Sequence, residues 1–335
     1  MNEKSIHEQL LKSPLPEIRK EKLAQIFNGE NLPSLCYDVV AKHVFSPDLH
    51  PERMDFILRH TMKEPGISVD KSAANEIYLQ NFHSKKTITD IPAWLKDDRL
   101  ADLAIQKEAQ EFILDRADIY ASNMLLLQYS AESGQPKGEI DYKNVNGSII
   151  IVLMQKSPVA FRNFKSKRYI HRITTAHADS GIELSMRKQL AFVQLDKALE
   201  LYITHGYNED EDVELLELFA LIADINNETV IRESSNNDLL SDIREDVIRF
   251  TRSKEVQQMI LAEDLAIMDW NSNMRLAKEN GIEQGIEQGI EKGQDKIIEL
   301  NKWLFAQNRD ADVRKATEDP EFLKSLLQEY SEEHP

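Results

Sequence analysis

Two short segments in the first third of the chain have the residue types of paired β-strands, and the first carries an acid. Residues 87–91 (TITDI) place Asp90 among side chains that favour a strand, and residues 100–106 (LADLAIQ) alternate again and end at Gln106. Side chains of a strand point to alternate faces, so Ala104 and Gln106 share a face of the second segment. A turn between the two segments would make a hairpin that presents a carboxylate near an amide.

A carboxylate on such a hairpin could serve phosphodiester hydrolysis. That reaction needs a divalent metal ion to polarise the phosphate, neutralise charge and activate water. Magnesium prefers oxygen ligands, commonly one or two carboxylates together with waters and phosphate oxygens. A hairpin with one acid on each strand can hold both acids against the same ion, and Asp90 supplies the first.

The segments around this hairpin have the pattern of an α/β domain. Helical periodicity covers most of the first 65 residues, over 16–27, over 35–45 and after Pro51, and it returns in a long helix over 109–129. Residues 148–155 are apolar on both faces, which is typical of a buried central strand. A strand pair, a crossover helix and a further strand form an α/β layer. The strand candidates are residues 76–79, 87–91, 100–105, 148–155, 166–171 and 191–195.

The second half of the chain has helical patterns. Residues 213–225 are strongly apolar, and a tetrapeptide repeat, GIEQGIEQGIEKGQ, covers 281–294. A four-residue period drifts by ~40° per repeat around a helix, and each interior glycine costs ~1 kcal/mol relative to alanine. The repeat is therefore either a polar, partly dynamic linker helix or a seam between two copies of the chain. Amphipathic helices are expected over 238–250 and 255–270, and a short one over 320–330.

Composition narrows the class of protein. The 335 residues are 41% hydrophobic and 30% charged, which is typical of a soluble, globular chain. The longest apolar runs, such as residues 149–154, are far shorter than the ~20 residues of a membrane helix. The N-terminus has no secretory signal, and a single cysteine, Cys36, fits a reducing compartment. We therefore expect a cytoplasmic protein that does not enter a membrane.

A local basic segment stands out in a chain of net charge −17. Residues 156–172 contain no acid, and Phe161, Phe164 and Tyr169 are interleaved with the cations. Phosphate contacts depend on the local charge rather than on the total, so this segment is a candidate DNA-binding surface. The alternative is a solvated basic strand with buried aromatic side chains. The candidate DNA-binding residues are Lys156, Arg162, Lys165, Lys167, Arg168 and Arg172.

Several motifs in the order of the chain resemble the Rpn-type recombination-promoting nucleases, the PD-(D/E)XK nuclease family transposases. YDVVAKHVF is similar to the family's Asp–Lys–Phe helix, and TITDI followed by DLAIQ is similar to its strand pair. FILDRADIYASNMLLLQY resembles its Arg-and-Tyr helix, and DYKNVNGSIIIVLMQ resembles its next strand. The Gly-Ile-Glu-Gln tail is also typical of the group. The resemblance implies a restriction-endonuclease-like core sheet flanked by helices, with a helical C-terminal region.

The same resemblance implies roles for particular residues. Asp90 would be the metal-binding acid for Mg²⁺ or Mn²⁺, and Gln106 would position water or the scissile phosphate. Lys42, Arg116 and Tyr120 would support the site. Taken alone, Lys42 and Asp38 four residues before it form an ordinary surface ion pair.

One position departs from the family pattern. The second acid is expected fourteen residues after Asp90, where this chain has Ala104. Three explanations are open: natural loss of activity, an introduced inactivating substitution, or a displaced carboxylate. Asp102 and Glu108 share the face of Ala104 in a straight strand, and we hypothesise that Glu108 or Glu111 is the substitute.

The sequence thus predicts a nuclease-like domain over 30–205. It is preceded by a helical segment over 1–29 and followed by a helical region over 206–270 and a repeat helix with a tail over 271–335. The leading function is a metal-dependent DNA endonuclease, acting in recombination or defence, with activity impaired at Ala104. The alternative is a catalytically inactive nuclease-fold protein that acts by DNA binding or protein association, including association of copies through the C-terminal helices.

Overall fold

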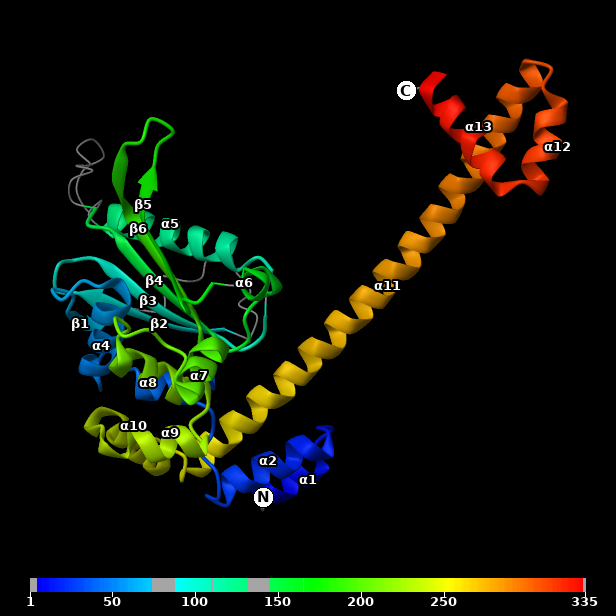
Figure 1. The fold of residues 1–335 in the computed structure, drawn as a ribbon. Coiled ribbons are helices and arrows are strands. Elements are labelled where there is room, and N and C mark those ends of the chain that lie inside the picture. The colour runs from blue at the N-terminus through cyan, green and yellow to red at the C-terminus, as the bar shows by residue number, and fades with distance from the viewer. Residues whose placement is uncertain (1–4, 74–87, 110, 132–144, 165, 334–335) are drawn as a thin grey trace. The chain divides into compact units, whose positions relative to one another are not determined.

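The computed structural model describes residues 5–73, 88–109, 111–131, 145–164 and 166–333. The chain divides into two compact units, Met1–Ile267 and Met268–Pro335, each of which is described by itself. The first unit contains the β-sheet and most of the helices (Figure 1).

A mixed sheet of six described strands, in the order β1-β2-β3-β4-β6-β5, forms the centre of the first unit. The middle strands β3, β4 and β6 run parallel, whereas β1, β2 and β5 pair antiparallel with their neighbours. The strands are β1 (Val69–Ser72), β2 (Ile88–Leu95), β3 (Leu100–Gln106), β4 (Ser148–Met154), β5 (Ile170–His177) and β6 (Glu183–Gln194).

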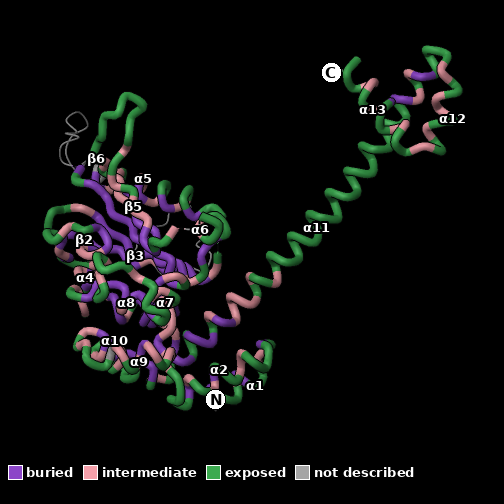
Figure 2. Tube along the Cα trace, in the orientation of Figure 1, coloured by how far each residue is buried: buried purple, intermediate pink, exposed green. Residues whose placement is uncertain are grey.

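Helices cover both faces of the sheet. α5 (Ile113–Ala131) lies along one face, and α4 (Pro51–Met62), α7 (Leu195–Thr204) and α8 (Val213–Ala223) lie on the other (Figure 1). Every residue of β3 and of β4 is buried, as two covered faces require (Figure 2). α5 connects the parallel strands β3 and β4 and so confirms the predicted α/β layer.

The predicted hairpin is present as β2 and β3. β2 extends beyond the predicted end at residue 91, because the segment 92–95, with Pro92, continues the strand instead of forming a connector. Pro92 has no N–H, but its carbonyl accepts a bond of 3.1 Å from the backbone N–H of Ala73. The turn falls after Leu95, where Asp98 takes the left-handed conformation with φ 62°.

The remaining strand predictions have mixed outcomes. Residues 76–79 lie outside the described residues. The strand over 148–155 is confirmed as β4. The prediction over 166–171 is displaced toward the N-terminus relative to β5, and the prediction over 191–195 covers only the end of β6. The first half of β6 is mostly exposed and polar, so its alternation gave no hydrophobic signal.

The helices before the sheet agree with the sequence pattern. α2 (Glu17–Phe27) begins after Pro16, α3 (Asp38–Val44) lies within the predicted range 35–45, and α4 begins at Pro51. A further helix, α1 (Ile6–Lys12), lies in the predicted helical segment 1–29, for which no separate first helix was delimited; the Ser5 side chain caps it by accepting from the Glu8 N–H at 3.3 Å. The first unit also contains α10 (Asp238–Phe250) and two short helices, α6 (Val159–Asn163) and α9 (Glu228–Glu233), with a 3-10 turn over Ser234–Asn236.

One long helix, α11 (Lys254–Ala306), includes both the predicted helix over 255–270 and the tetrapeptide repeat. Its residues 273–299 are exposed (Figure 2), and a Cβ atom added at any glycine of the repeat would meet nothing within 4 Å among the described residues. In the second unit, its end packs with α12 (Asp310–Glu318) and α13 (Pro320–Glu333) around Leu300, Leu304 and Leu326. Among the described residues, no helix is both long enough and apolar enough to span a membrane.

Candidate active site

Asp90 lies on the face of the sheet that α5 covers, directly opposite Ala104. The β2–β3 register pairs these two residues, so their side chains point to the same face. Ala104 belongs to a buried cluster with Ile113 and Ala117 of α5. The hairpin thus presents one carboxylate beside a methyl group.

The environment of Asp90 disfavours its charged form. Its Oδ1 atom is buried and has no hydrogen-bond partner among the described residues, and Arg116 Nη2 lies 3.8 Å from its Oδ2. Burial raises the pKa of Asp90 by more than the charges of Arg116 and Lys42 lower it. Asp90 is therefore a carboxylate with one oxygen left unpartnered and a proton affinity above that of an exposed aspartate.

Arg116 and Tyr120 are the side chains that α5 contributes to the surroundings of Asp90. The Arg116 guanidinium lies over the Tyr120 ring, 4.7 Å from its centroid, in a cation–π arrangement. Burial raises the pKa of Tyr120, Arg116 opposes this rise, and the charges of Asp90 and Asp102 add to it. The family resemblance implies that these two residues support the site, and the structure brings both into electrostatic contact with Asp90.

Helix α3 contributes the charges on the other side of Asp90. Lys42 Nζ pairs with Asp38 at 2.8 Å, which is the surface ion pair that the sequence indicates. The charges of both residues act on the pKa of Asp90. Lys42 is half-exposed, so it remains accessible to a phosphate near the end of the sheet.

Gln106 ends β3 on the same face as Asp90 and Ala104. It is buried, and its Nε2 donates to the Glu108 carbonyl oxygen at 2.6 Å. This bond fixes the Gln106 amide at the end of β3. The position agrees with the role that the family resemblance implies for Gln106.

The carboxylates proposed as substitutes for the missing acid have other surroundings. Both Glu108 oxygens accept from Lys156 Nζ, at 2.8 and 2.9 Å. Glu111 is exposed before α5 begins. Asp102, by contrast, is fully buried on the face of Ala104, two residues earlier, and pairs with Pro92 across the hairpin. The charge of Asp102, like that of Asp90, raises the pKa of Tyr120, so Asp102 faces the α5 side of the candidate site.

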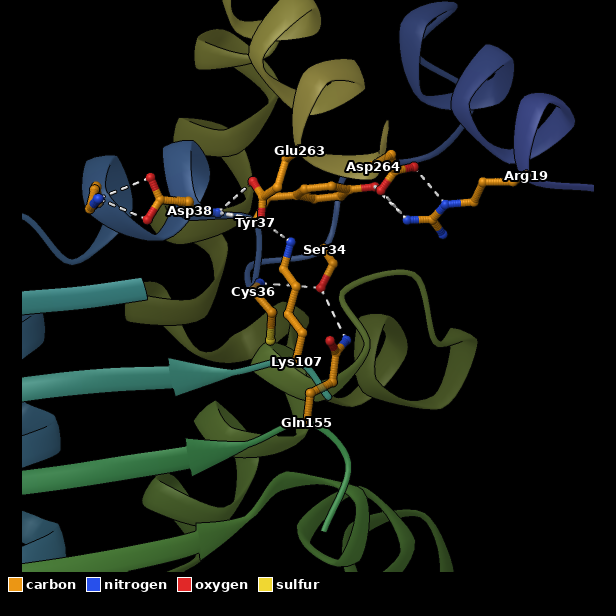
Figure 3. Close-up of polar contacts among 10 residues, drawn as sticks. Arg19, Ser34, Cys36, Tyr37, Asp38, Lys107, Gln155, Glu263 and Asp264 are labelled. Carbon is orange, nitrogen blue, oxygen red and sulfur yellow. Dashed lines mark hydrogen bonds and ion pairs between the residues drawn. The ribbon is translucent and has the colours of Figure 1, made fainter. Parts of the chain in front are cut away.

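Two acids of α11, which the sequence did not indicate, bind residues of α2, of α3 and of the segment just after β3. Glu263 accepts from the backbone N–H of Asp38 at 2.9 Å and pairs with Lys107, the residue after Gln106 (Figure 3). Asp264 binds the Arg19 guanidinium through both oxygens at 2.6 Å (Figure 3). These partners are more than 150 residues apart in the chain, so no local pattern reports them.

The described residues of this face do not form a complete set of ligands for a divalent ion. The unpartnered Oδ1 of Asp90 could serve as one ligand, but Ala104 supplies none. The Arg116 cation, near the other oxygen, also offsets the charge of Asp90 that would attract an ion. The hairpin is therefore one carboxylate short of the pair that holds a metal between two strands.

The basic segment does not form one continuous row. Lys156 pairs with Glu108, whereas Arg162 and Lys167 are exposed; Lys165 lies outside the described residues. Arg168 and Arg172 line a pocket whose other walls include acids of the loop over 208–212. Of the interleaved aromatics, Tyr169 is buried, Phe161 packs against the sheet cluster and Phe164 is exposed.

The sheet order, the α5 crossover and the Asp90–Gln106 hairpin together define a PD-(D/E)XK nuclease fold. The chain belongs to the PD-(D/E)XK nuclease family transposases, whose family pattern matches residues 36–277. Searches of curated proteins and of solved structures found no match. The family confirms the resemblance and the fold inferred from the sequence. Nucleases of this fold typically use divalent metal ions, and a nuclease family indicates DNA as the substrate class.

Proposed function

We propose that this chain is a DNA-directed member of its family, acting in recombination or defence, in which metal-dependent phosphodiester cleavage is impaired at Ala104. The observation that carries the proposal is the register of the hairpin, which sets Ala104 directly opposite Asp90. A glutamate at that position would place a second carboxylate against the first. The alanine leaves Asp90, Gln106 and the α5 side chains in place without it.

The remaining residues can still bind and orient a DNA backbone. Lys42 offers a half-exposed ammonium group next to the site, and Arg116 orients Asp90 through their charge pair. Gln106 presents an amide whose position is fixed by its bond to the Glu108 carbonyl. In a complete site, the Mg²⁺ or Mn²⁺ ion would supply charge neutralisation and an activated water.

A plasmid-nicking assay with Mg²⁺ or Mn²⁺ tests the proposal. The unaltered chain should nick slowly or not at all, and Ala104→Glu should raise the rate on the order of 100-fold, since even outer-shell groups of metal sites change activity by 10–100-fold. Ala104→Gln is the matched control, because it adds the same bulk without a charge. Asp90→Asn combined with Ala104→Glu should abolish the gain.

Thermal unfolding gives a second readout that needs no turnover. Two carboxylates opposite each other repel, so Ala104→Glu should lower Tm in EDTA and recover in Mn²⁺. The unaltered chain and Ala104→Gln should show no such recovery. Nicking by the unaltered chain as fast as by Ala104→Glu would show that Ala104 does not impair the site, and would direct attention to Asp102.

The alternative function, DNA binding without cleavage, rests on the exposed cations of the basic segment. Replacing Lys165, Lys167 and Arg168 by glutamine should weaken DNA binding and reduce the slope of affinity against salt concentration. Replacing Lys278, Lys292 and Lys296 of α11 changes the net charge equally and serves as the control. Equal loss in both triple variants would count against a local binding surface.

Association of copies through α11 is a separate proposal, favoured by three isoleucines of the repeat. Ile282, Ile286 and Ile290 are each more than half exposed, and a Cβ atom added at the glycine before each of them would meet nothing within 4 Å among the described residues. Light scattering should show a larger oligomer for the full chain than for a chain that ends at Asn280. The same oligomeric state for both chains would contradict the proposal.

We also propose a cytoplasmic location, which the single buried cysteine, Cys36, supports.

A further inference from the structure

Three side chains with metal-ligating atoms converge on the first unit, outside the nuclease face. His43 belongs to α3, His50 precedes α4, and Asp246 belongs to α10. One ligand atom from each lies within 4.8 Å of the other two. His43 Nε2 lies 3.0 Å from Asp246 Oδ1, and His50 Nε2 lies 3.3 Å from Asp246 Oδ2.

The surroundings hold these side chains in position. The His43 ring stacks on Phe250, with centroids 3.8 Å apart and planes at 2°. The His50 ring meets the edge of the His43 ring at 6.0 Å and 81°. Asp246 is buried, whereas both histidines are half-buried, so a small ion could enter from solvent.

Two charged groups face the cluster from α4. Arg53 Nη1 donates to Asp246 Oδ2 at 2.7 Å and to the Val44 carbonyl at 3.1 Å. Glu52 Oε1 lies 3.4 Å from His50 Nδ1, the nitrogen that faces away from Asp246. Ligating carboxylates and imidazoles commonly have such outer partners, which orient them. The Arg53 cation also opposes a second cation, and Glu52 offsets part of that repulsion.

We propose that His43, His50 and Asp246 bind a divalent transition-metal ion, for which zinc is the probe, as a structural tie between α3 and α10. Ligands of a tetrahedral ion with bonds of about 2.0–2.1 Å are about 3.3 Å apart. The two histidine–carboxylate separations of 3.0 and 3.3 Å are close to this, and one ligand atom from each residue lies within 4.8 Å of the other two. Two imidazoles and one carboxylate suit zinc better than magnesium or calcium, which prefer oxygen ligands. Water would complete the coordination.

This site is independent of Asp90 but adjoins the nuclease face through α3. His43 follows Lys42, so an ion on His43 would immobilise the helix that presents Lys42. The ion would thus stabilise the fold, with no part in hydrolysis.

The test is a titration of the full, metal-free chain with Zn²⁺ against a competing chromophoric chelator. The unaltered chain should bind one tight equivalent, and His43→Gln and His50→Gln should each weaken that binding by at least about 10-fold. His60→Gln is the matched control. His60 also stacks on a phenylalanine, Phe56, and pairs with an aspartate, Asp212 at 2.6 Å, but it belongs to no three-ligand cluster among the described residues.

Asp90→Asn should keep the zinc equivalent, which separates this site from the nuclease face. Cobalt in place of zinc should give an absorption spectrum of four-coordinate metal that disappears in His50→Gln. Circular dichroism in EDTA checks that His50→Gln folds; His50 lies outside the helices, so it decides the matter if His43→Gln does not fold. Zinc binding that is absent from the unaltered chain, or unchanged in His50→Gln, would overturn the proposal.

Discussion

Asp90 is a carboxyl group whose burial has a cost in stability. Its pKa is raised in the folded state, chiefly by burial, so the folded chain binds the proton more tightly than the unfolded chain. Stability then falls as pH rises from the unfolded pKa through the folded one, and the loss is complete at neutral pH. We expect Asp90→Asn to increase the free energy of unfolding at pH 7.

The gain in Asp90→Asn should shrink as the pH approaches about 4, where the unfolded carboxyl also binds its proton. Denaturant unfolding across this range measures the effect. Asp97→Asn, on the exposed turn after β2, is the control and should show no such gain. A variant less stable than the unaltered chain at pH 7 would mean that the pair with Arg116 outweighs burial.

Local sequence was sufficient to find part of the site at the level of residues. Strand alternation singled out Asp90 and Gln106, whereas the family resemblance pointed to Arg116 and Tyr120, and the structure brings these side chains to one face of the sheet. The partners Glu263 and Asp246 could not be found this way. They lie 225 residues from Asp38 and 203 from His43, and only the packing of α10 and α11 on α3 joins them.

At the scale of elements, α11 caps α3 from outside. Tyr37, the residue before α3, gives no side-chain cap, and Glu263 accepts the first N–H instead while it pairs with Lys107. Glu263→Gln leaves the buried Lys107 ammonium without its counter-charge, so we expect a loss of about 3 kcal/mol in stability. Faster hydrogen exchange at the Asp38 amide should accompany it.

Glu279→Gln provides the comparison for this change. Glu279 lies on the same helix, its side chain is exposed, and its Arg275 partner is 3.9 Å away. Such a pair contributes little, so the free energy of unfolding should change by less than about 0.5 kcal/mol. Equal effects of the two substitutions would contradict a capping role for Glu263.

The glycines of the repeat weaken α11 without any packing benefit in a single chain. A Cβ atom added at Gly285 or Gly289 meets nothing within 4 Å. Gly285→Ala and Gly289→Ala should therefore each stabilise the helix by about 1 kcal/mol, measured by thermal loss of helical circular dichroism. If copies of the chain pack on these glycines, both substitutions will instead reduce association.

Gly147, before β4, is the opposite case. Its φ is +120°, and an added Cβ would lie 2.9 Å from the Arg187 carbonyl oxygen. Gly147→Ala should therefore destabilise the first unit by at least about 1–3 kcal/mol. The pair of experiments distinguishes glycines that the fold requires from glycines that it only tolerates.

The sequence predicted the existence of elements better than their ends. The hairpin, α5, β4 and the apolar helix α8 follow from hydrophobic periodicity. The exposed half of β6 and the short strand β1 carry no such pattern, because their side chains face solvent or pair at the edge. The unbroken length of α11 was also unexpected, since four glycines argue against a continuous helix.

At the scale of the whole molecule, the two units have separate hydrophobic cores. The core of Met268–Pro335 is small, around Leu300, Leu304 and Leu326, so it should be the less stable unit. Calorimetry should show two transitions, and a chain that ends at Asn280 should lose the lower one. A single cooperative transition in the full chain would show that the units unfold together.

The packing of Ala104 has a consequence for any path by which this chain could regain a second acid. Its methyl group is part of the apolar cluster that joins the sheet to Ile113 and Ala117 of α5. A longer, charged side chain there must displace part of that cluster before it can meet an ion. Ala104→Glu should therefore lower the free energy of unfolding even where it raises cleavage, and a smaller side chain at Ile113 would offset that loss, so the order of the two substitutions matters as much as their identity.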